Sequence, residues 1–425
     1  MPEIACYQRY IEVLKEELVP AQGCTEPIAI AYAAAKAREV LGRFPEEMLV
    51  KCSGNIIKNA KSVIVPNTGN LKGIEVSAIA GAVAGNAAKG MQVLSDVTVE
   101  DIGTIARLAG SGLCRVEWME SDASLHIVAG MRAGEDDVHV EIIHSHTNIS
   151  RIVKNGTVLY EKIFDSANFN AALSDRSFLT VQGIYDFAHA ARIDDMRDLL
   201  DRQIECNLAI ADEGLSGAYG VNVGRLLLES YPGNVFAKAR AYAAAGSDAR
   251  MSGCVLPVIT NSGSGNQGIT ASLPVIVYAR EKGLRAEALY RALLLSNLIT
   301  IHEKTGLGRL SAYCGAVCAA CGAGAGITFL EGGTLEQIDR TITNTLANVS
   351  GIVCDGAKAS CAAKIASCVE AAMLAHLLAM RNLSFEVDSG IVKETVESTI
   401  AAACRLGREG MRATDAEILK IMMEK

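Results

Sequence analysis

Apolar and polar residues alternate in several short segments of the first 170 residues. A period of two is typical of β-strands, so we expect strands over MLVKCS (48–53), SVIVPN (62–67), CRVEWM (114–119), SLHIVAGM (124–131) and VHVEIIHSH (138–146). Asn155-Gly156 separates two further strand-like segments and predicts a tight hairpin. Residues 28–42 and 73–88 are rich in small side chains and predict closely packed helices, the first ending at Gly42.

From about residue 175 the apolar period becomes that of a helix. Residues 196–214, 287–304 and 334–351 show it most clearly. Glycine-rich segments at 263–268 and 322–326 predict breaks between helices. The sequence therefore predicts an α+β N-terminal domain, residues 1–170, followed by an all-α domain, residues 171–425.

The segment QGCTEP (22–27) precedes the first of the two small-residue helices. Thr25 is a candidate N-cap, and Pro27 is tolerated in a first turn. Cys24 would then lie at the positive end of a helix, where the pKa of a thiol is lowered and a thiolate can act as base or nucleophile. A buried cysteine that only packs would explain the same residue.

Three later cysteines form a candidate metal site. Cys314 lies in SAYCGAVC, and Cys354 and Cys361 are the two ends of CDGAKASC. The last two are seven residues apart, so on one helix their thiols would face the same way. Three convergent thiolates suit an iron–sulfur cluster that needs four ligands, and its open iron could act as a Lewis acid. The alternative is core packing, because the chain has 13 cysteines.

Other polar residues offer weaker alternatives. Cys318 and Cys321 form a C-x-x-C pair that could be redox-active or compete as cluster ligands. His144 and His146 end a predicted strand, where a surface or hydrogen-bonding role is favoured over metal binding. The pair His302-Glu303 (302–303) falls within a predicted helix and is expected to be structural.

Taken together, QGCTEP, SGNIIKNAKSVIVPNTG (53–69), GSGNQG (263–268) and CDGAKASC resemble the iron–sulfur L-cysteine desulfidase family, which is related to the bacterial iron–sulfur L-serine dehydratases. The resemblance covers nearly the whole chain, with 1–170 similar to the dehydratase beta domain and 171–425 to the alpha domain. It implies that the all-α domain carries a [4Fe–4S] cluster on Cys314, Cys354 and Cys361. It also implies that Cys24 is the active-site thiol, where the serine enzymes have a histidine. The C-terminal cysteine that can cap the cluster in those enzymes has no counterpart in the ending IMMEK.

Two motifs are candidates for binding the amino acid. Ser264, Gly265 and Asn266 of GSGNQG lie in a sharp turn whose backbone N–H groups could take a carboxylate. The resemblance adds Thr25 and the segment Ser53-Gly54-Asn55 (53–55) as substrate-binding residues. The same glycine-rich turn could hold the phosphate of pyridoxal phosphate, but no lysine has a distinctive Schiff-base setting, and the three cysteines would then be unexplained.

Composition narrows the class of protein. The net charge is −8 and the Lys and Arg residues are dispersed, which argues against a nucleic-acid partner. The first 18 residues predict an amphipathic helix and not a signal peptide. The uncharged run 311–330 is long enough to span a membrane, but it is built from Ala, Gly and Cys and favours a packed core. We therefore expect a cytoplasmic protein with reduced cysteines and no membrane contact, which could form a homo-oligomer.

The predicted activity is α,β-elimination of L-cysteine to pyruvate, ammonia and sulfide. Cys24 would take the Cα proton, and the open iron would bind the leaving group. Two alternatives remain, namely dehydration of L-serine on the same scaffold and a non-enzymatic iron–sulfur redox sensor or binding protein.

Overall fold

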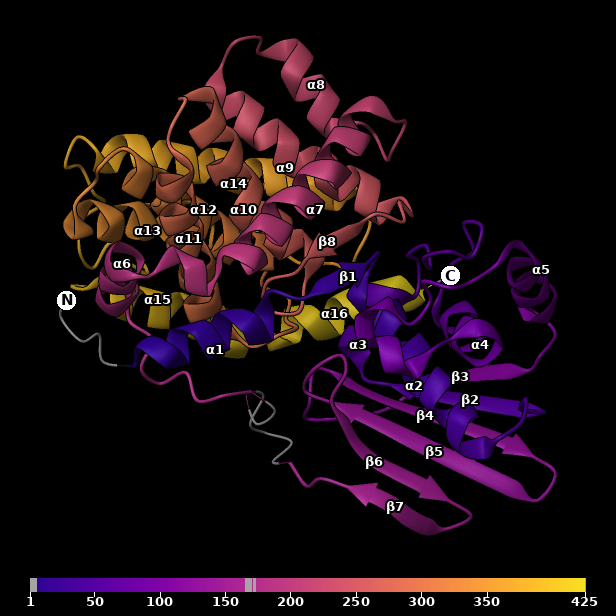
Figure 1. The fold of residues 1–425 in the computed structure, drawn as a ribbon. Coiled ribbons are helices and arrows are strands. Elements are labelled where there is room, and N and C mark those ends of the chain that lie inside the picture. The colour runs from indigo at the N-terminus through magenta and orange to yellow at the C-terminus, as the bar shows by residue number, and fades with distance from the viewer. Residues whose placement is uncertain (1–5, 165–169, 171–172, 425) are drawn as a thin grey trace.

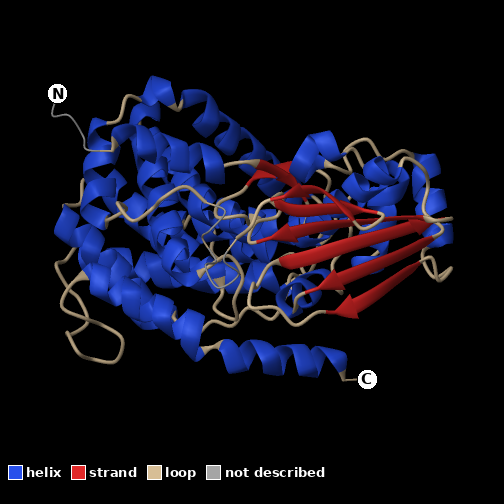
Figure 2. Cartoon of the chain, turned by 90° about the horizontal axis from the view of Figure 1, so that it is seen from below, coloured by secondary structure: helices blue, strands red, loops and turns tan. Residues whose placement is uncertain are grey.

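The computed structural model, which describes residues 6–164, 170 and 173–424, has a sheet-containing part beside a helical part (Figure 1). The mixed first half and helix-rich second half confirm the predicted fold class at this level. Figure 2 shows the strands together on one side of the molecule and most helices on the other.

Six strands form one sheet in the order β3-β2-β4-β5-β6-β7. They are β2 (Glu47–Cys52), β3 (Cys114–Trp118), β4 (His126–Ala133), β5 (Asp136–Ile143), β6 (Ile149–Lys154) and β7 (Thr157–Glu161). Only the β2–β3 pair is parallel. Asn155 and Gly156 join β6 to β7 with φ values of 52° and 76°, which confirms the predicted hairpin because such turns need positive φ at both positions.

One predicted strand is wrong. Residues 62–67 form a turn that makes a single bridge, between Ile64 and Lys72. Pro66 has no N–H to donate to a sheet, and α3 (Gly54–Ala60) already turns the chain away from the sheet after β2.

Two small-residue helices, α2 (Thr25–Leu41) and α4 (Ile74–Ala84), lie side by side and α2 packs on β4 and β5. A Cβ on Gly81 would lie 2.2 Å from the carbonyl oxygen of Ala31, so the two backbones touch only because this residue is glycine. Gly42 ends α2 with φ 84°, as predicted. The short helices η1 (Ala87–Gln92) and α5 (Val99–Leu108) complete this part.

The helical part contains most of the longest helices. Its elements are α6 (Val181–Ala190), η2 (Ile193–Asp195), α7 (Arg197–Ser216), α8 (Val223–Ser230), α9 (Val235–Met251), α10 (Gly265–Glu281), α11 (Ala286–Leu307), α12 (Gly315–Leu330), α13 (Leu335–Val349), α14 (Ser360–Ala379), α15 (Val396–Arg405) and η3 (Leu406–Gly410). The three predicted helices correspond to α7, α11 and α13.

The predicted break at Gly322–Gly326 is wrong, because these residues lie inside α12. A Cβ on Gly322 would lie 2.3 Å from the Ser296 carbonyl oxygen of α11, so this glycine permits close helix packing. Most of the uncharged run 311–330 is buried there, in line with the predicted core role. Within the described residues one helix, α14, is long and apolar enough to cross a membrane, yet 56% of its apolar window is buried in the core.

The two chain ends cross between the parts. Helix α1 (Tyr7–Glu17) packs in the helical core through Tyr10 and Leu14, and β1 (Pro20–Gln22) pairs with β8 (Pro257–Ile259). Helix α16 (Arg412–Met423) returns to α3, where Asp415 pairs with the buried Lys58. Most residues around the predicted domain boundary at 170–171 are not among the residues that the structure describes. The chain ends hold the two parts together around one cavity.

Candidate active site

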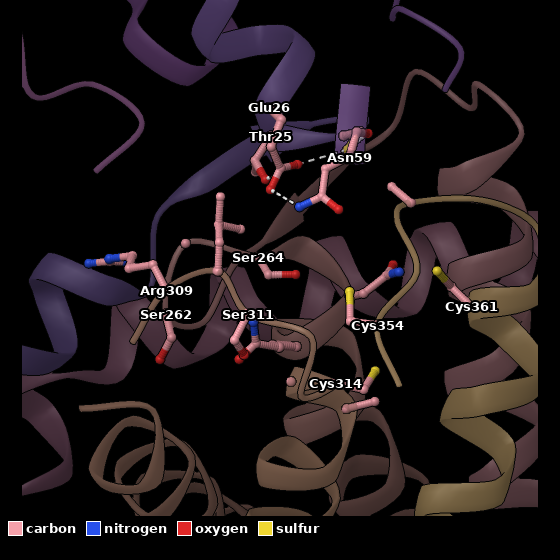
Figure 3. Close-up of a pocket in the computed structure, with 18 of the residues that line it drawn as sticks. Thr25, Glu26, Asn59, Ser262, Ser264, Arg309, Ser311, Cys314, Cys354 and Cys361 are labelled. Atoms are coloured by element: carbon pink, nitrogen blue, oxygen red, sulfur yellow. Dashed lines mark hydrogen bonds between the residues drawn. The ribbon is translucent and has the colours of Figure 1, made fainter. Parts of the chain in front are cut away.

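The cavity of about 100 Å³ lies where the start of α2 meets the helical part (Figure 3). Its walls come from the N-terminal ends of α2, α10, α12 and α14, from the end of α3 and from the loops before α12 and α14. The predicted residues on its lining are Cys24, Thr25, Ser264, Asn266, Cys314, Cys354 and Cys361. Four helix starts at one cavity favour negatively charged groups in it.

Cys314, Cys354 and Cys361 come from three different local settings. Cys314 is the N-cap residue of α12, and Cys361 lies in the first turn of α14. The backbone N–H of Cys314 donates to Ile352 O at 3.0 Å, which holds the segment before Cys354 beside Cys314. Figure 3 shows the three sulfur atoms on one side of the cavity.

The premise that Cys354 and Cys361 share one helix is wrong. Cys354 lies in the loop that precedes α14. Gly356 turns this loop with φ 101°, and a Cβ there would lie 2.4 Å from Lys58 O on α3. The two thiols meet because the loop folds back onto α3, and not because of helical spacing.

The three thiols form a donor set that fits an iron–sulfur cluster. Burial and then the neighbouring Cys354 raise the pKa of Cys314 to about 12, which indicates that the sulfurs are near one another. Within the described part of the chain, no group of three His, Cys, Asp or Glu residues is close enough to hold a single metal ion. A cluster attaches each cysteine to a different iron, so its ligands stand further apart than those of one ion. Three soft cysteine sulfurs at one cavity wall suit that arrangement.

Cys318 and Cys321 do not belong to this cavity. Both are buried inside α12 beside Glu303. Cys404 lies in the same place and donates to Glu303 O at 3.2 Å. Burial raises the pKa of the Glu303 carboxyl to about 8. The geometry thus separates the C-x-x-C pair from the three cavity cysteines.

Cys24 is the N-cap residue of α2, so the helix begins at Thr25 and the predicted N-cap was one residue late. Its side chain is 2% exposed, and Sγ donates to Glu26 Oε2 at 3.0 Å. Burial and the Glu26 charge raise the pKa of Cys24 well above its usual value. The predicted lowering of that pKa is therefore wrong, because the adjacent carboxylate and the loss of water outweigh the helix terminus.

Glu26 and His146 are site residues that the sequence did not single out for this role. Burial alone would raise the pKa of Glu26, but His146 and the Cys24 thiol bring it to about 2. His146 Nε2 lies 3.6 Å from Glu26 Oε1, and Asn59 Nδ2 donates to the same oxygen at 3.4 Å. His146 sits just after β5, and no spacing in the sequence connects it to residue 26.

The GSGNQG motif surrounds the start of α10. Gly263 turns the chain with φ 77°, Ser264 is the N-cap residue, and Ser264, Asn266 and Gln267 line the cavity. Gly265 lies just behind the lining, with its Cα against the guanidinium of Arg250. The predicted carboxylate-binding turn is therefore a helix N-terminus with its free N–H groups.

Ser53, Gly54 and Asn55 lie elsewhere. They line a separate pocket with Trp118 and Leu419. Ser53 Oγ donates to Ser124 O at 2.8 Å, and Asn55 Nδ2 donates to Asp415 Oδ2 at 3.4 Å. The structure does not bring these three residues to the cysteines. Asn59, at the other end of α3, is the member of the same motif that reaches the cavity.

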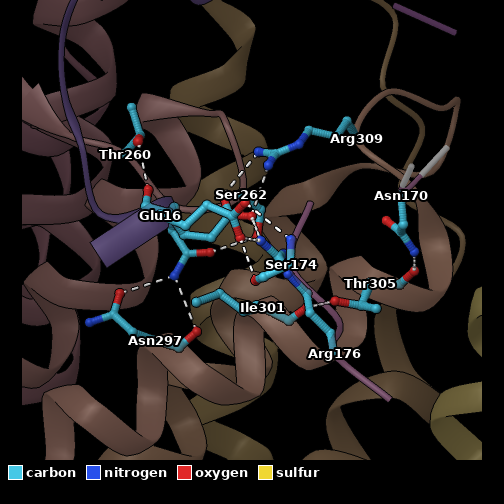
Figure 4. A network of polar contacts seen from close by, with 12 residues as sticks. Glu16, Asn170, Ser174, Arg176, Thr260, Ser262, Asn297, Ile301, Thr305 and Arg309 are labelled. Atoms are coloured by element: carbon cyan, nitrogen blue, oxygen red, sulfur yellow. Dashed lines mark hydrogen bonds and ion pairs between the residues drawn. The ribbon is translucent and has the colours of Figure 1, made fainter. Parts of the chain in front are cut away.

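Arg309 also lines the cavity, but its charge is already paired. Its Nη1 and Nη2 donate to the two carboxylate oxygens of Glu17 at 2.9 and 2.8 Å. Arg176 pairs with the same carboxylate, in a polar network that ties α1 to the loop after α11 (Figure 4). Arg309 therefore shapes the wall of the cavity and offers little charge to a ligand.

Several buried polar atoms on the lining make no hydrogen bond to any described residue. They are Asn59 Oδ1, Arg250 Nε and Gln267 Oε1. Buried polar atoms are nearly always paired in folded proteins. Acceptors and donors left open around one small cavity indicate a ligand that carries both kinds of group.

Comparison with known proteins covers both parts of the fold. Residues 88–420 match the serine dehydratase alpha chain family. A UPF0597 protein from Lachnoclostridium phytofermentans is 54% identical over 98% of this chain and 100% of its own length. A UPF0597 protein from Treponema denticola is 48% identical over 98% of both chains.

Proposed function

Because this chain belongs to the serine dehydratase alpha chain family, as its motifs predicted, we propose that it is a lyase acting on L-cysteine. The products would be pyruvate, ammonia and sulfide. The observation that carries the proposal is one small cavity that has the Cys24–Glu26 pair on one wall and Cys314, Cys354 and Cys361 on another.

Cys314, Cys354 and Cys361 would hold a [4Fe–4S] cluster. When bound through only three thiolates, the cluster supplies an open iron that acts as a Lewis acid on the leaving group. Lys364 lies near the thiol of Cys314, where its positive charge opposes the rise in pKa caused by burial and Cys354. That charge helps this wall to bear thiolates.

Cys24 would remove the Cα proton. Its Sγ–H donates to Glu26 Oε2, so the base forms only when that proton passes to Glu26, a transfer that costs energy because the pKa of Cys24 is raised and that of Glu26 is about 2. The free thiolate then takes the proton from Cα, the electron pair of the Cα–H bond forms the Cα=Cβ bond, and the Cβ–S bond breaks with its electron pair leaving on sulfur as hydrosulfide. The resulting aminoacrylate hydrolyses to pyruvate and ammonia. Glu26 releases its proton to the departing product, which returns the pair to its starting state.

The open acceptors would bind the substrate ammonium. Asn59 Oδ1 and Gln267 Oε1 are buried and unpaired, and Gln267 packs against Gly315 next to Cys314. The cavity volume of only about 100 Å³ also favours a small amino acid as the substrate. A cluster iron prefers the soft sulfur of cysteine to a hydroxyl oxygen, while the family description favours L-serine as the second candidate substrate.

The test is product formation by anaerobically prepared protein. L-cysteine should give equal amounts of pyruvate, ammonia and sulfide, and L-serine should give less pyruvate per unit time. Cys24→Ala should abolish most of this turnover, while Cys318→Ala, a buried cysteine outside the cavity, should leave it unchanged. Absence of pyruvate from both amino acids would favour the redox-sensor or binding-protein alternative.

A further inference from the structure

Arg250, near the end of α9, carries a buried charge that no carboxylate neutralises. Arg250 is 3% exposed and lines the cavity. Nη1 donates to Asn266 Oδ1 at 3.1 Å, and Nε has no partner. Among the residues that the structure describes, no Asp or Glu oxygen lies within 4.0 Å of its guanidinium.

Three other cations near the cavity differ from Arg250 in this respect. Arg309 is paired with Glu17, Lys58 with Asp415 and Lys364 with Asp355. Lys304 on the lining also has no carboxylate partner among the described residues, but burial lowers its pKa and its Nζ donates to the Arg309 carbonyl oxygen at 3.3 Å. Buried charges are normally paired, because an unpaired charge loses its hydration without compensation. The missing partner of Arg250 is therefore expected to come from a ligand.

The position of Arg250 adds a second feature that favours an anion. A Cβ on Gly265 would lie 2.3 Å from Arg250 Nε, so the guanidinium lies directly against the first turn of α10. An anion bound to Arg250 would also meet the free N–H groups at this helix N-terminus. Planar guanidinium groups bind carboxylates with two parallel hydrogen bonds.

Arg250 also lies between the two reactive walls. Burial raises the pKa of Cys24 and of Cys361, and the positive charge of Arg250 opposes that rise in both. Cys361 packs against the small apolar cluster formed by Cys24, Val63 and Met251, the residue after Arg250. A group held by Arg250 would thus be within reach of both the thiol and the three-cysteine wall.

We propose that Arg250 binds the α-carboxylate of the substrate and makes the cavity selective for free α-amino acids. This inference rests on the proposed function in taking an amino acid as the ligand. With the carboxylate on Arg250 and the N-terminus of α10, and the ammonium on Asn59 and Gln267, Cα is fixed near Cys24. The side chain then points toward Cys314, Cys354 and Cys361. Amides, esters and amines that lack the carboxylate would lose this anchor.

The test compares equilibrium binding of two ligands that cannot undergo elimination. L-alanine and L-alaninamide are titrated by calorimetry into anaerobically prepared protein that carries its cluster. The unaltered protein should bind L-alanine about 100-fold more tightly than L-alaninamide, since truncating one partner of a buried charged pair has effects of this order. Arg250→Gln should reduce the preference to less than about fivefold, and Arg250→Lys should retain an intermediate preference.

Arg240→Gln is the matched control. Arg240 lies on the same helix and pairs with Glu370 away from the cavity, so its loss should keep the full preference. An Arg250→Gln protein that still prefers L-alanine about 100-fold would overturn the inference, as would an unaltered protein with no preference. An Arg250-dependent preference without pyruvate formation from L-cysteine would instead support this inference and contradict the proposed function. Normal pyruvate formation from L-cysteine, together with an Arg250→Gln protein that keeps the full preference for L-alanine, would support the proposed function and contradict this inference.

Discussion

Gly268→Ala tests why the GSGNQG motif ends in glycine. A Cβ at this position would lie 1.9 Å from the carbonyl oxygen of Ile259 in β8 and 2.8 Å from the Thr260 carbonyl carbon. Both neighbours are backbone atoms, so no side chain can rotate away. Real Cβ contacts begin near 3.0 Å, so α10 would have to move by about 1 Å from β8.

Two opposing terms set the effect of this substitution on stability. Overpacking of a well-packed interior costs about 1–3 kcal/mol. Alanine is a better helix former than glycine by up to about 1 kcal/mol. The cost of overpacking outweighs the gain in helix propensity, because the new Cβ contacts backbone atoms that cannot rotate away. The free energy of unfolding should therefore fall by about 1–2 kcal/mol. The start of α10 carries Ser264, Asn266 and Gln267, and a shift of about 1 Å in a site can cost about 100-fold in rate.

Gly103→Ala provides the matched control. Gly103 lies within α5, is exposed, and has no atom within 4 Å of the new Cβ. The free energy of unfolding of this variant should rise by up to about 1 kcal/mol, and its activity should be unchanged. Denaturant unfolding and kcat/KM for pyruvate formation measure both effects. A Gly268→Ala protein with unchanged unfolding and unchanged kcat/KM would refute the packing argument.

The remaining predictions concern the cysteines. Replacing Cys314, Cys354 or Cys361 with Ala should empty the site of about four irons and four sulfides per chain, whereas Cys318→Ala should retain them; iron and sulfide analysis decides this, and full iron content in all three variants would contradict the ligand set. Cys24→Ala should keep the cluster absorption spectrum but lower turnover by about two to four orders of magnitude, the usual contribution of a general base; normal turnover would remove Cys24 from the chemistry. Activity should be lost in air and restored by ferrous iron and thiol, and persistence for days in air without metal would oppose a cluster-dependent reaction.

Local patterns predicted most of the secondary structure. Alternation marked β2 to β5, and Asn155-Gly156 marked the β6–β7 hairpin because positive φ at two successive positions is favourable for few residue types. The wrong strand at residues 62–67 and the wrong break at Gly322–Gly326 have different origins. Residues 62–67 follow α3 directly and contain Pro66, so the cause is local, whereas Gly322 stays helical in close contact with α11, which local sequence does not reveal.

The motifs also located part of the cavity. Cys24, Ser264, Asn266 and the three later cysteines line it, and each belongs to a short recognisable segment. Ser53-Gly54-Asn55 (53–55) does not, because α3 points its other end, Asn59, toward the cavity. The direction in which a helix presents its ends is a property of packing and not of local sequence.

The sequence by itself determined the two kinds of secondary structure, the glycines and prolines that end elements, and the cysteine-containing motifs. These features depend on residues within a few positions of one another. Tertiary structure alone decided the protonation of Cys24, the placement of Glu26 and His146 beside it, and the lack of a carboxylate partner for Arg250 among the described residues. Burial and charge at these residues arise from segments that are far apart in the chain, by 120 residues for Glu26 and His146 and by 337 for Cys24 and Cys361. Electrostatic interactions depend on distance in space and on access of water.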